Sequence, residues 1–309
     1  MVQSKKKGSL MRDIWRSKYL YLILLPSFVW LAVFCYGPMY GVLMAFVDYK
    51  VKRGVFGSEF VGLENFKRIF VTPDAVRAIK NTIQISVMRL ITSFPIPIIV
   101  AIMFNEMRGK KIKKVYQTIF TFPHFLSWVV VANILRNFLA SSGAVNVLIQ
   151  KLGYEPINFL ANVELFRPLL YSTAIWKEAG WSAIIYMACI SNIDTTLYDA
   201  AKVDGANRWR QIWHITLPGL KSIIVIQLIM AVGGLMNAGF DQIFNFRNDV
   251  VKSTAQIIDS YVHDITFGAK PNYSFTTAVG LFKTVINFAL LIITNKIVTW
   301  LNDGEGLFR

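Results

Sequence analysis

The 309-residue sequence has little charge: 17% of its residues are Asp, Glu, Lys or Arg, whereas 54% are hydrophobic. A water-soluble domain carries roughly 25% charged residues. The composition therefore excludes an ordinary soluble fold and favours an integral membrane protein. Lys and Arg outnumber Asp and Glu by 33 to 18, an excess that in membrane proteins marks cytoplasmic loops and contact with lipid headgroups. No nucleic-acid-binding motif accompanies it, so we expect no nucleic-acid partner.

Cysteine and histidine are also scarce. The two cysteines, Cys35 and Cys189, lie far apart within apolar runs, where we expect them to be small buried hydrophobic residues. The three histidines, His124, His214 and His263, are scattered without the spacing of metal ligands. The sequence therefore predicts neither a disulfide nor a metal site.

Motifs for nucleotide binding and catalysis are missing as well. No G-x-x-x-x-G-K-[ST] phosphate loop occurs, so the chain cannot hold ATP by that route. No H-E-x-x-H motif or nucleophile elbow is present, which disfavours an intramembrane enzyme. No internal repeat relates the two halves, which disfavours a secondary transporter. These two classes are the alternatives to the hypothesis developed below.

Six apolar segments are present, each long enough to cross a hydrocarbon layer, which takes about 20 residues. They cover residues 19–47, 78–104, 115–139, 165–190, 219–240 and 276–301. Pro26 and Pro38 predict a kink in the first segment, and the "PIP" sequence at 95–97 predicts a break in the second. We predict an all-α polytopic membrane protein with six transmembrane helices over 19–301, a basic segment at 1–18 and a tail at 302–309.

Basic clusters set the expected orientation, because cytoplasmic loops concentrate Lys and Arg. The clusters lie in the N-terminal segment, between the second and third apolar segments, and after the fourth. With both termini in the cytoplasm, all three clusters fall on the cytoplasmic face. The first outer loop is an exception, since it carries Lys50, Lys52 and Arg53.

A polar stretch at 194–218 separates the fourth and fifth apolar segments. Asp194 is suited to cap a short helix, and Gly205 stands where that helix is expected to end, since glycine adopts a left-handed conformation without penalty. Apolar residues then recur at helical spacing up to Pro218. The pattern predicts a cytoplasmic helix–glycine–helix hairpin. From the residues alone, an amphipathic loop resting on lipid headgroups is the alternative interpretation.

The same stretch resembles the EAA loop of the membrane subunits of ABC importers. The residues in register with that family's pattern are Asp199, Ala200, Ala201, Asp204, Gly205, Ala206, Trp209, Ile215, Leu217 and Pro218. Asp199 replaces the usual glutamate, and Ile212 stands where sugar importers commonly have phenylalanine. The resemblance implies that this loop fits a cleft on an ATP-hydrolysing subunit and transmits its closure to the membrane helices.

Further motifs extend the resemblance over nearly the whole chain. "YGPMYG", "VGLENF", "WKEAGW", "GFDQIFNF" and "FTTAVGLFKTVINFALLIITNKI" are similar to the LplB-type permeases of the carbohydrate branch. The resemblance implies a type I importer fold in the bacterial cytoplasmic membrane, with no cofactor in this chain. It implies four kinds of partner: a second homologous permease, two ATPase subunits that bind ATP and Mg, an extracytoplasmic sugar-binding protein, and lipid. The implied cargo is an oligosaccharide or polysaccharide fragment.

Ionisable residues inside apolar spans usually face a bundle interior or a wet cavity. Lys177 and Glu178 lie near the middle of the fourth segment, and Trp181 neighbours both at helical spacing. An aromatic ring beside two ions suits sugar recognition, and the resemblance places these three residues at sugar-contact positions. The alternative is that Lys177 and Glu178 pair with other helices, Glu178 with Arg89 or Lys283.

Other polar residues extend the candidate path. The remaining candidates are Arg89, Leu235, Asn237, Asp241, Lys283 and Asn287. Asn237 and Asn287 equally suit hydrogen bonding between helices. An excess of cations near the path would suit an acidic sugar such as a uronate.

Overall fold

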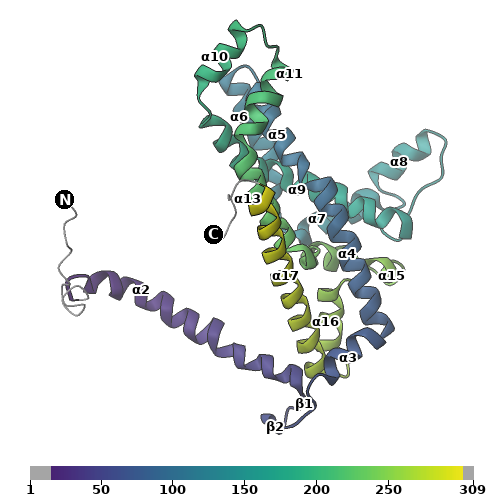
Figure 1. Ribbon diagram of the computed structural model, residues 1–309. Helices are drawn as coiled ribbons and strands as arrows, with labels where there is room; N and C mark the ends of the chain where they lie inside the picture. The colour runs from purple at the N-terminus through teal and green to yellow at the C-terminus, as the bar shows by residue number, and fades with distance from the viewer. Residues whose placement is uncertain (1–14, 302–309) are drawn as a thin grey trace.

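A computed structural model of the protein describes residues 15–301. Most of the basic segment 1–18 and the whole tail 302–309 therefore lie outside the described residues. The structure is helical apart from one small hairpin, and Figure 1 shows the helices gathered into an elongated bundle from which the first segment projects.

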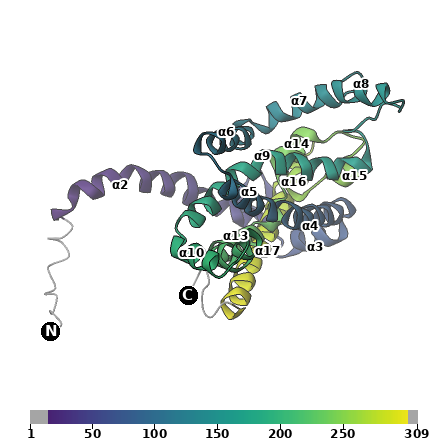
Figure 2. The same ribbon diagram turned by 90° about the horizontal axis from the view of Figure 1, so that it is seen from above.

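The first apolar segment is one helical stretch of changing pitch. It comprises α2 (Lys18–Trp30), the π-helical η1 (Leu31–Tyr36) and the 3₁₀-helical η2 (Gly37–Phe46). Both views show α2 standing away from the bundle (Figures 1 and 2), and neither α2 nor η1 contains a buried residue. An antiparallel hairpin, β1 (Val47–Lys50) and β2 (Gly54–Phe60), follows with Val47 opposite Phe60. This hairpin departs from the predicted all-α fold.

The second segment breaks where its prolines predict. A short helix, α3 (Glu64–Val71), leads into α4 (Pro73–Ser93), and α5 (Pro95–Glu106) begins after Phe94. Pro95 has no backbone N–H to donate to the preceding turn, so a new helix starts there more readily than the old one continues.

The third segment is not the continuous helix predicted over 115–139. It comprises α6 (Lys110–Thr121), the 3₁₀ turn η3 (Phe122–Phe125) and α7 (Trp128–Leu139), and α8 (Ala144–Lys151) follows. Pro123 ends the first helix, and the Ser127 hydroxyl accepts a hydrogen bond from Val130 N at 3.3 Å to start the next. Figure 2 shows α6, α7 and α8 in a row along one side of α9.

The fourth segment forms α9 (Val163–Ser191), a 29-residue helix capped by the Asn162 side chain. The fifth is shorter than predicted, because α13 (Lys221–Gly233) is followed by the 3₁₀ turn η5 (Leu235–Asn237) and by α14 (Phe240–Phe246). Positive φ angles at Ala238 (46°) and Gly239 (78°) reverse the chain before residue 240. After α15 (Lys252–Ala255) and α16 (Ile258–Thr266), the sixth segment forms α17 (Tyr273–Leu301).

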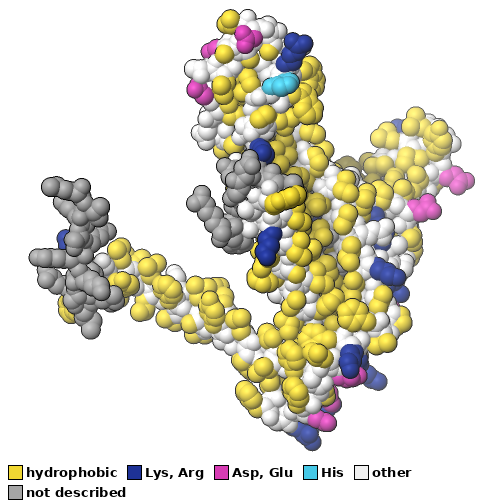
Figure 3. Space-filling view, in the orientation of Figure 1, with side chains coloured by type: hydrophobic (Ala, Val, Ile, Leu, Met, Phe, Trp, Pro, Cys, Tyr) yellow, Lys and Arg dark blue, Asp and Glu magenta, His cyan; other side chains and the backbone are white. Residues whose placement is uncertain are grey.

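Four helical stretches among the described residues are long and apolar enough to cross a membrane. They are Lys18–Phe46, Pro73–Glu106, Trp128–Lys151 and Tyr273–Trp300, and a helix pair bent by 59°, Arg208–Gly219 with Lys221–Gly233, is a fifth candidate. Helix α9 has the length but carries Lys177 and Glu178 near its middle. Figure 3 shows charged side chains at both ends of the molecule and a mostly hydrophobic surface with fewer charged side chains between them.

Two buried clusters hold α9 at the centre of the bundle. One joins Ile85 of α4 and Ile243 of α14 to Phe166 near the start of α9. The other joins Phe104 of α5 and Leu220, just before α13, to Tyr186 near the end of α9. Helices α4, α5 and α13 are thus fixed around α9, and their arrangement leaves a hollow between them.

Gly180 permits the close approach of α9 to α6. A Cβ atom at this position would overlap the carbonyl oxygen of Phe120, which is backbone and cannot swing aside. We expect Gly180→Ala to lower the free energy of unfolding by about 1–3 kcal/mol, the usual cost of overpacking. Gly280→Ala is the matched control, because that helical glycine in α17 has no atom within 4 Å of the added Cβ. Thermal unfolding in detergent should show a lower midpoint temperature for Gly180→Ala and not for Gly280→Ala. Equal midpoint temperatures for the two variants would contradict the close contact between α9 and α6.

Candidate translocation cavity and coupling hairpin

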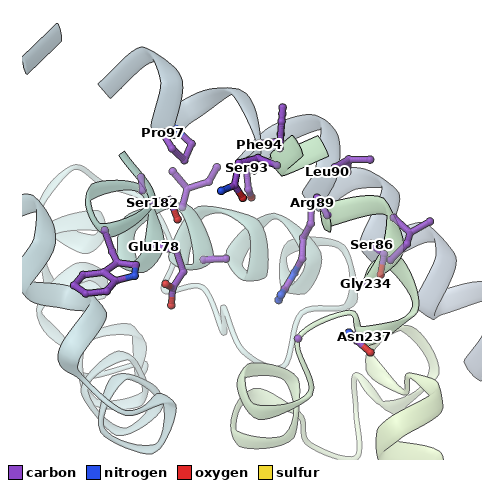
Figure 4. A pocket seen from close by; sticks show the side chains of 18 of the residues that line it. Ser86, Arg89, Leu90, Ser93, Phe94, Pro97, Glu178, Ser182, Gly234 and Asn237 are labelled. Carbon is purple, nitrogen blue, oxygen red and sulfur yellow. The ribbon is translucent and has the colours of Figure 1, made fainter. Parts of the chain in front are cut away.

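A cavity of about 610 Å³ lies between α4–α5, α9 and the junction of α13 with η5. Its lining is mostly apolar, with a few polar side chains such as Ser182 and Gln227. Figure 4 shows Arg89 extending from α4 across the hollow, with Glu178 on one side and Asn237 on the other. Concave sites of this kind, apolar with a few convergent polar groups, are typical of ligand-binding cavities.

The structure brings five of the nine candidate path residues to this cavity. Arg89, Glu178, Trp181, Leu235 and Asn237 line it, whereas Lys177, Asp241, Lys283 and Asn287 do not. Helix packing therefore decides which candidate residues line the cavity. Charge does not decide it, because both the lining and the non-lining candidates include charged and uncharged residues.

Lys177 is directed toward η3 instead of the cavity. Its ammonium donates to the backbone carbonyl of His124 at 2.7 Å and contacts Glu178 Oε1 at 3.1 Å, and only 5% of the residue is exposed. Glu178 also contacts His124 Nδ1 at 2.7 Å. The alternative considered from the sequence, a pairing of Glu178 with Arg89 or Lys283, is not formed, because the break in the third segment places His124 beside α9.

His124 is a residue that the sequence analysis did not assign to the site. Its ring stacks on Trp181, with the ring planes at 1° and the centroids 4.4 Å apart. Phe125 packs edge-on against the same indole at 5.7 Å. The η3 turn therefore fixes the orientation of both Trp181 and Glu178 at the cavity wall. Pro123 within this turn and Ser127 just after it are the sequence signal that could have located it.

Lys283, Asn287 and Asn237 connect helices on the α17 side. Lys283 pairs with Asp259 of α16 at 2.6 Å. Asn287 accepts a hydrogen bond from Met236 N at 2.9 Å and donates to Asn237 at 3.5 Å. These contacts fit the interpretation that Asn237 and Asn287 form hydrogen bonds between helices. Asn237 also lines the cavity.

Arg89 is the cation of the cavity. It donates to the Oε1 atom of Gln242, a buried residue of α14. Gln242 in turn donates to Thr173 Oγ1 at 2.7 Å and to Leu170 O at 2.9 Å, both on α9. A side chain at Gly239 would overlap the guanidinium. These contacts fix the position of Arg89 between three helices.

The 194–218 stretch folds as the predicted hairpin. Helix α10 (Thr195–Val203) is capped by Asp194, and hydrogen bonds from Thr196 hold the pKa of Asp194 below its ordinary value. Gly205 (φ 74°) then reverses the chain, and Ala206 N donates to Ala201 O at 2.8 Å, the bond typical of a glycine-terminated helix.

The second half of the hairpin comprises α11 (Arg208–Gln211), the π-helical η4 (Ile212–Thr216) and α12 (Leu217–Gly219). Pro218 was expected to end this half, but helical structure continues through it to Gly219. A hydrogen bond of 3.0 Å between Tyr198 OH and Thr216 Oγ1 ties the two halves together. Arg208 approaches Glu106 of α5 at 3.7 Å, which connects the hairpin to the bundle.

The family-pattern residues of the hairpin divide into two groups. Half-buried positions form its interior: Ala201, Ala206, Ile212, Ile215 and Leu217. Exposed positions form its outer surface: Asp199, Ala200, Asp204, Gly205, Trp209 and Pro218. Trp209 and its neighbour Trp213 are 72% and 64% exposed. The hairpin occupies one end of the molecule and the β1–β2 hairpin the other (Figure 1).

Comparison with known proteins identifies the class. The family model described as "Binding-protein-dependent transport system inner membrane component" matches residues 93–303. The chain is 42% identical to the polygalacturonan/rhamnogalacturonan transport system permease protein YteP of Bacillus subtilis (strain 168), over 99% of this chain and 95% of the relative. It is also 42% identical to Protein LplB of the same organism, over 97% of this chain and 94% of the relative.

A solved structure shows the same fold. A chain from the crystal structure of a bacterial alginate ABC transporter, in complex with alginate pentasaccharide-bound periplasmic protein, superposes with a TM-score of 0.88. The sequence identity is 36%, and the match covers 96% of this chain and 100% of the other. The chain therefore belongs to the inner-membrane components of binding-protein-dependent transport systems. It is a permease subunit of an ABC transporter, and members of this family are not enzymes themselves.

Proposed function

We propose that this chain is one of two membrane subunits of a type I ABC importer for acidic oligosaccharides, located in the bacterial cytoplasmic membrane. The relatives named for polygalacturonan/rhamnogalacturonan and for alginate transport support an acidic sugar as cargo. In this proposal the four candidate spans, the bent helix pair and α9 together make six crossings. In this arrangement both termini lie on the side of the α10–α11 hairpin.

The α10–α11 hairpin is the observed feature that supports a role in coupling the ATPase subunits to the membrane helices. Its exposed tryptophans form an apolar surface on a compact unit that is tied internally by Tyr198 and Thr216 and to α5 by Arg208. Exposed aromatic residues are the usual anchors of protein interfaces. In this proposal they fit a cleft on one of two ATP-binding subunits, which hold ATP and Mg.

The mechanism is alternating access. Closure of the ATPase subunits moves the hairpin, and the movement passes to α9 and α13, which flank the hairpin in the chain and line the cavity. The cavity opens outward to an extracytoplasmic binding protein, which delivers the sugar, and after hydrolysis opens inward. The second permease covers the exposed surface of α2, a helix in which no residue is buried within the described chain.

Transport by the reconstituted complex tests this function. Proteoliposomes containing this chain, its partner permease and the ATPase subunits should accumulate a labelled oligogalacturonide against its gradient when the binding protein and ATP are supplied. Omission of ATP should abolish accumulation. Uphill uptake by this chain alone, driven by an ion gradient, would instead identify a secondary transporter.

A further inference from the structure

Three polar side chains on one face of α4 line the cavity and carry buried hydrogen-bonding atoms without a partner. Ser86, Arg89 and Ser93 all line it, and their spacing of three and four residues places them on one side of the helix. The hydroxyls of both serines and the Nε atom of Arg89 are buried without a hydrogen-bond partner in residues 15–301. We call these three residues the α4 polar stripe.

This concentration is specific to the cavity. Six buried side-chain nitrogen or oxygen atoms lack a partner in the described part of the chain, and three of them belong to the stripe. Buried polar groups are nearly always paired, so such a cluster calls for an explanation. Rotation of these side chains toward the cavity would let a ligand accept from Arg89 and exchange hydrogen bonds with the two hydroxyls, which would supply the missing partners.

The charge of the stripe indicates the chemistry of that ligand. The hydrogen bond from Arg89 goes to an uncharged amide, that of Gln242, and no ion pair within residues 15–301 includes Arg89. The one acid that lines the cavity, Glu178, contacts His124 and Lys177 instead. Arg89 is half-buried. A partly desolvated cation without a counter-ion is costly, and an anionic group beside it is correspondingly favoured.

We propose that the α4 polar stripe binds the carboxylate of a uronate unit and thereby selects acidic over neutral oligosaccharides. This inference depends on the proposed import of oligosaccharides. Guanidinium groups match carboxylates in geometry and charge, and serine hydroxyls complete the set of donors. Seven residues of helix rise about 10 Å, so the stripe is long enough to contact neighbouring groups along one sugar chain. The contacts to Gln242 and Gly239 hold the guanidinium at its position before the sugar arrives.

Equilibrium binding to the assembled importer tests the proposal. The complex of both permeases and both ATPases is placed in nanodiscs and arrested with vanadate, and the binding protein is omitted so that its own selectivity does not contribute. The probes are labelled trigalacturonate and its carboxyl-reduced, uncharged counterpart. We expect the parent complex to bind the acidic sugar at least about tenfold more tightly, the usual effect of a charge-assisted hydrogen bond.

Arg89→Gln should make the affinities for the acidic and the uncharged sugar similar, because it should weaken the binding of the acidic sugar only. Ser86→Ala with Ser93→Ala, which leaves the contact between Arg89 and Gln242 intact, should weaken the acidic sugar several-fold. Ser182→Ala is the matched control, because it removes a cavity serine of α9 outside the stripe, and it should change neither affinity. If Arg89→Gln fails to assemble, the double serine variant decides.

Two results would overturn the stripe's role. One is a parent complex without preference for the charged sugar. The other is an Arg89→Gln complex whose preference is unchanged or whose affinity falls equally for both sugars. Either result leaves oligosaccharide import standing. A parent complex that accumulates no oligosaccharide in proteoliposomes would instead overturn the proposed function.

Discussion

Gly205→Val should reduce sugar uptake by the assembled importer at least about tenfold while ATP hydrolysis continues. Gly205 has a φ of 74°, a conformation that costs a residue with a side chain about 1–2 kcal/mol and a β-branched residue more. Relief of this strain would break the bond from Ala206 N to Ala201 O and change the angle between the two halves of the hairpin. The hairpin would then no longer present its tryptophans to the ATPase in one geometry.

The matched control for this variant is Gly153→Val. Gly153 follows α8, has a φ of 86°, and like Gly205 has no atom within 4 Å of an added Cβ. The two variants therefore introduce the same kind of backbone strain in exposed turns. We expect similar shifts in thermal unfolding but a loss of uptake per ATP hydrolysed only for Gly205→Val. Equal coupling ratios in the two variants would contradict a special role for the hairpin.

Glu178→Gln should be more destabilising than Lys177→Met, although the two residues form one ion pair. The side chain of Lys177 is 6% exposed and that of Glu178 is 41% exposed. Loss of the carboxylate leaves a buried ammonium with only uncharged partners, among them the His124 carbonyl and the Trp128 ring. Removing one member of a buried pair costs up to about 3–5 kcal/mol. Because Glu178 reaches the cavity and is partly solvated, we expect the cost to lie near the lower end of that range.

Lys177→Met should cost about 1 kcal/mol, because methionine fills much of the same space and Glu178 keeps its contact with His124. The double variant should recover part of the stability lost in Glu178→Gln. Thermal unfolding of the four proteins in detergent measures this cycle. If the stability losses of the two single variants add up to that of the double variant, the ion pair contributes nothing to stability. A larger loss for Lys177→Met than for Glu178→Gln would contradict the deeper burial of Lys177.

Much of the fold follows from local sequence signals. Apolar runs about 20 residues long form helices, the "PIP" sequence breaks the second segment at Phe94, and Gly205 reverses the hairpin. These features depend on hydrophobic length, a missing proline N–H and the freedom of glycine, all of which are properties of the local chain.

The remaining features depend on weaker signals or on tertiary packing. The break at η3 lies inside an unbroken apolar run, so hydropathy alone does not show it, although Pro123 marks its position. Hydropathy alone also does not show the early end of α13, although glycines 233, 234 and 239 mark its position. The partners of Glu178 depended on where η3 packs, and 54 residues separate His124 from Glu178. Spacing within one helix therefore could not predict this contact.

The most direct test of the account is a cross-link from the hairpin to the ATPase. Val203 and Phe56 are both 88% exposed, but they lie on the α10–α11 hairpin and on the β1–β2 hairpin at the opposite end. With single cysteines at these positions in the assembled importer, Val203→Cys should cross-link to an ATPase subunit and the cross-link should stop uptake, whereas Phe56→Cys should not react with that subunit. Cross-linking to the ATPase from position 56 and not from position 203 would contradict the account.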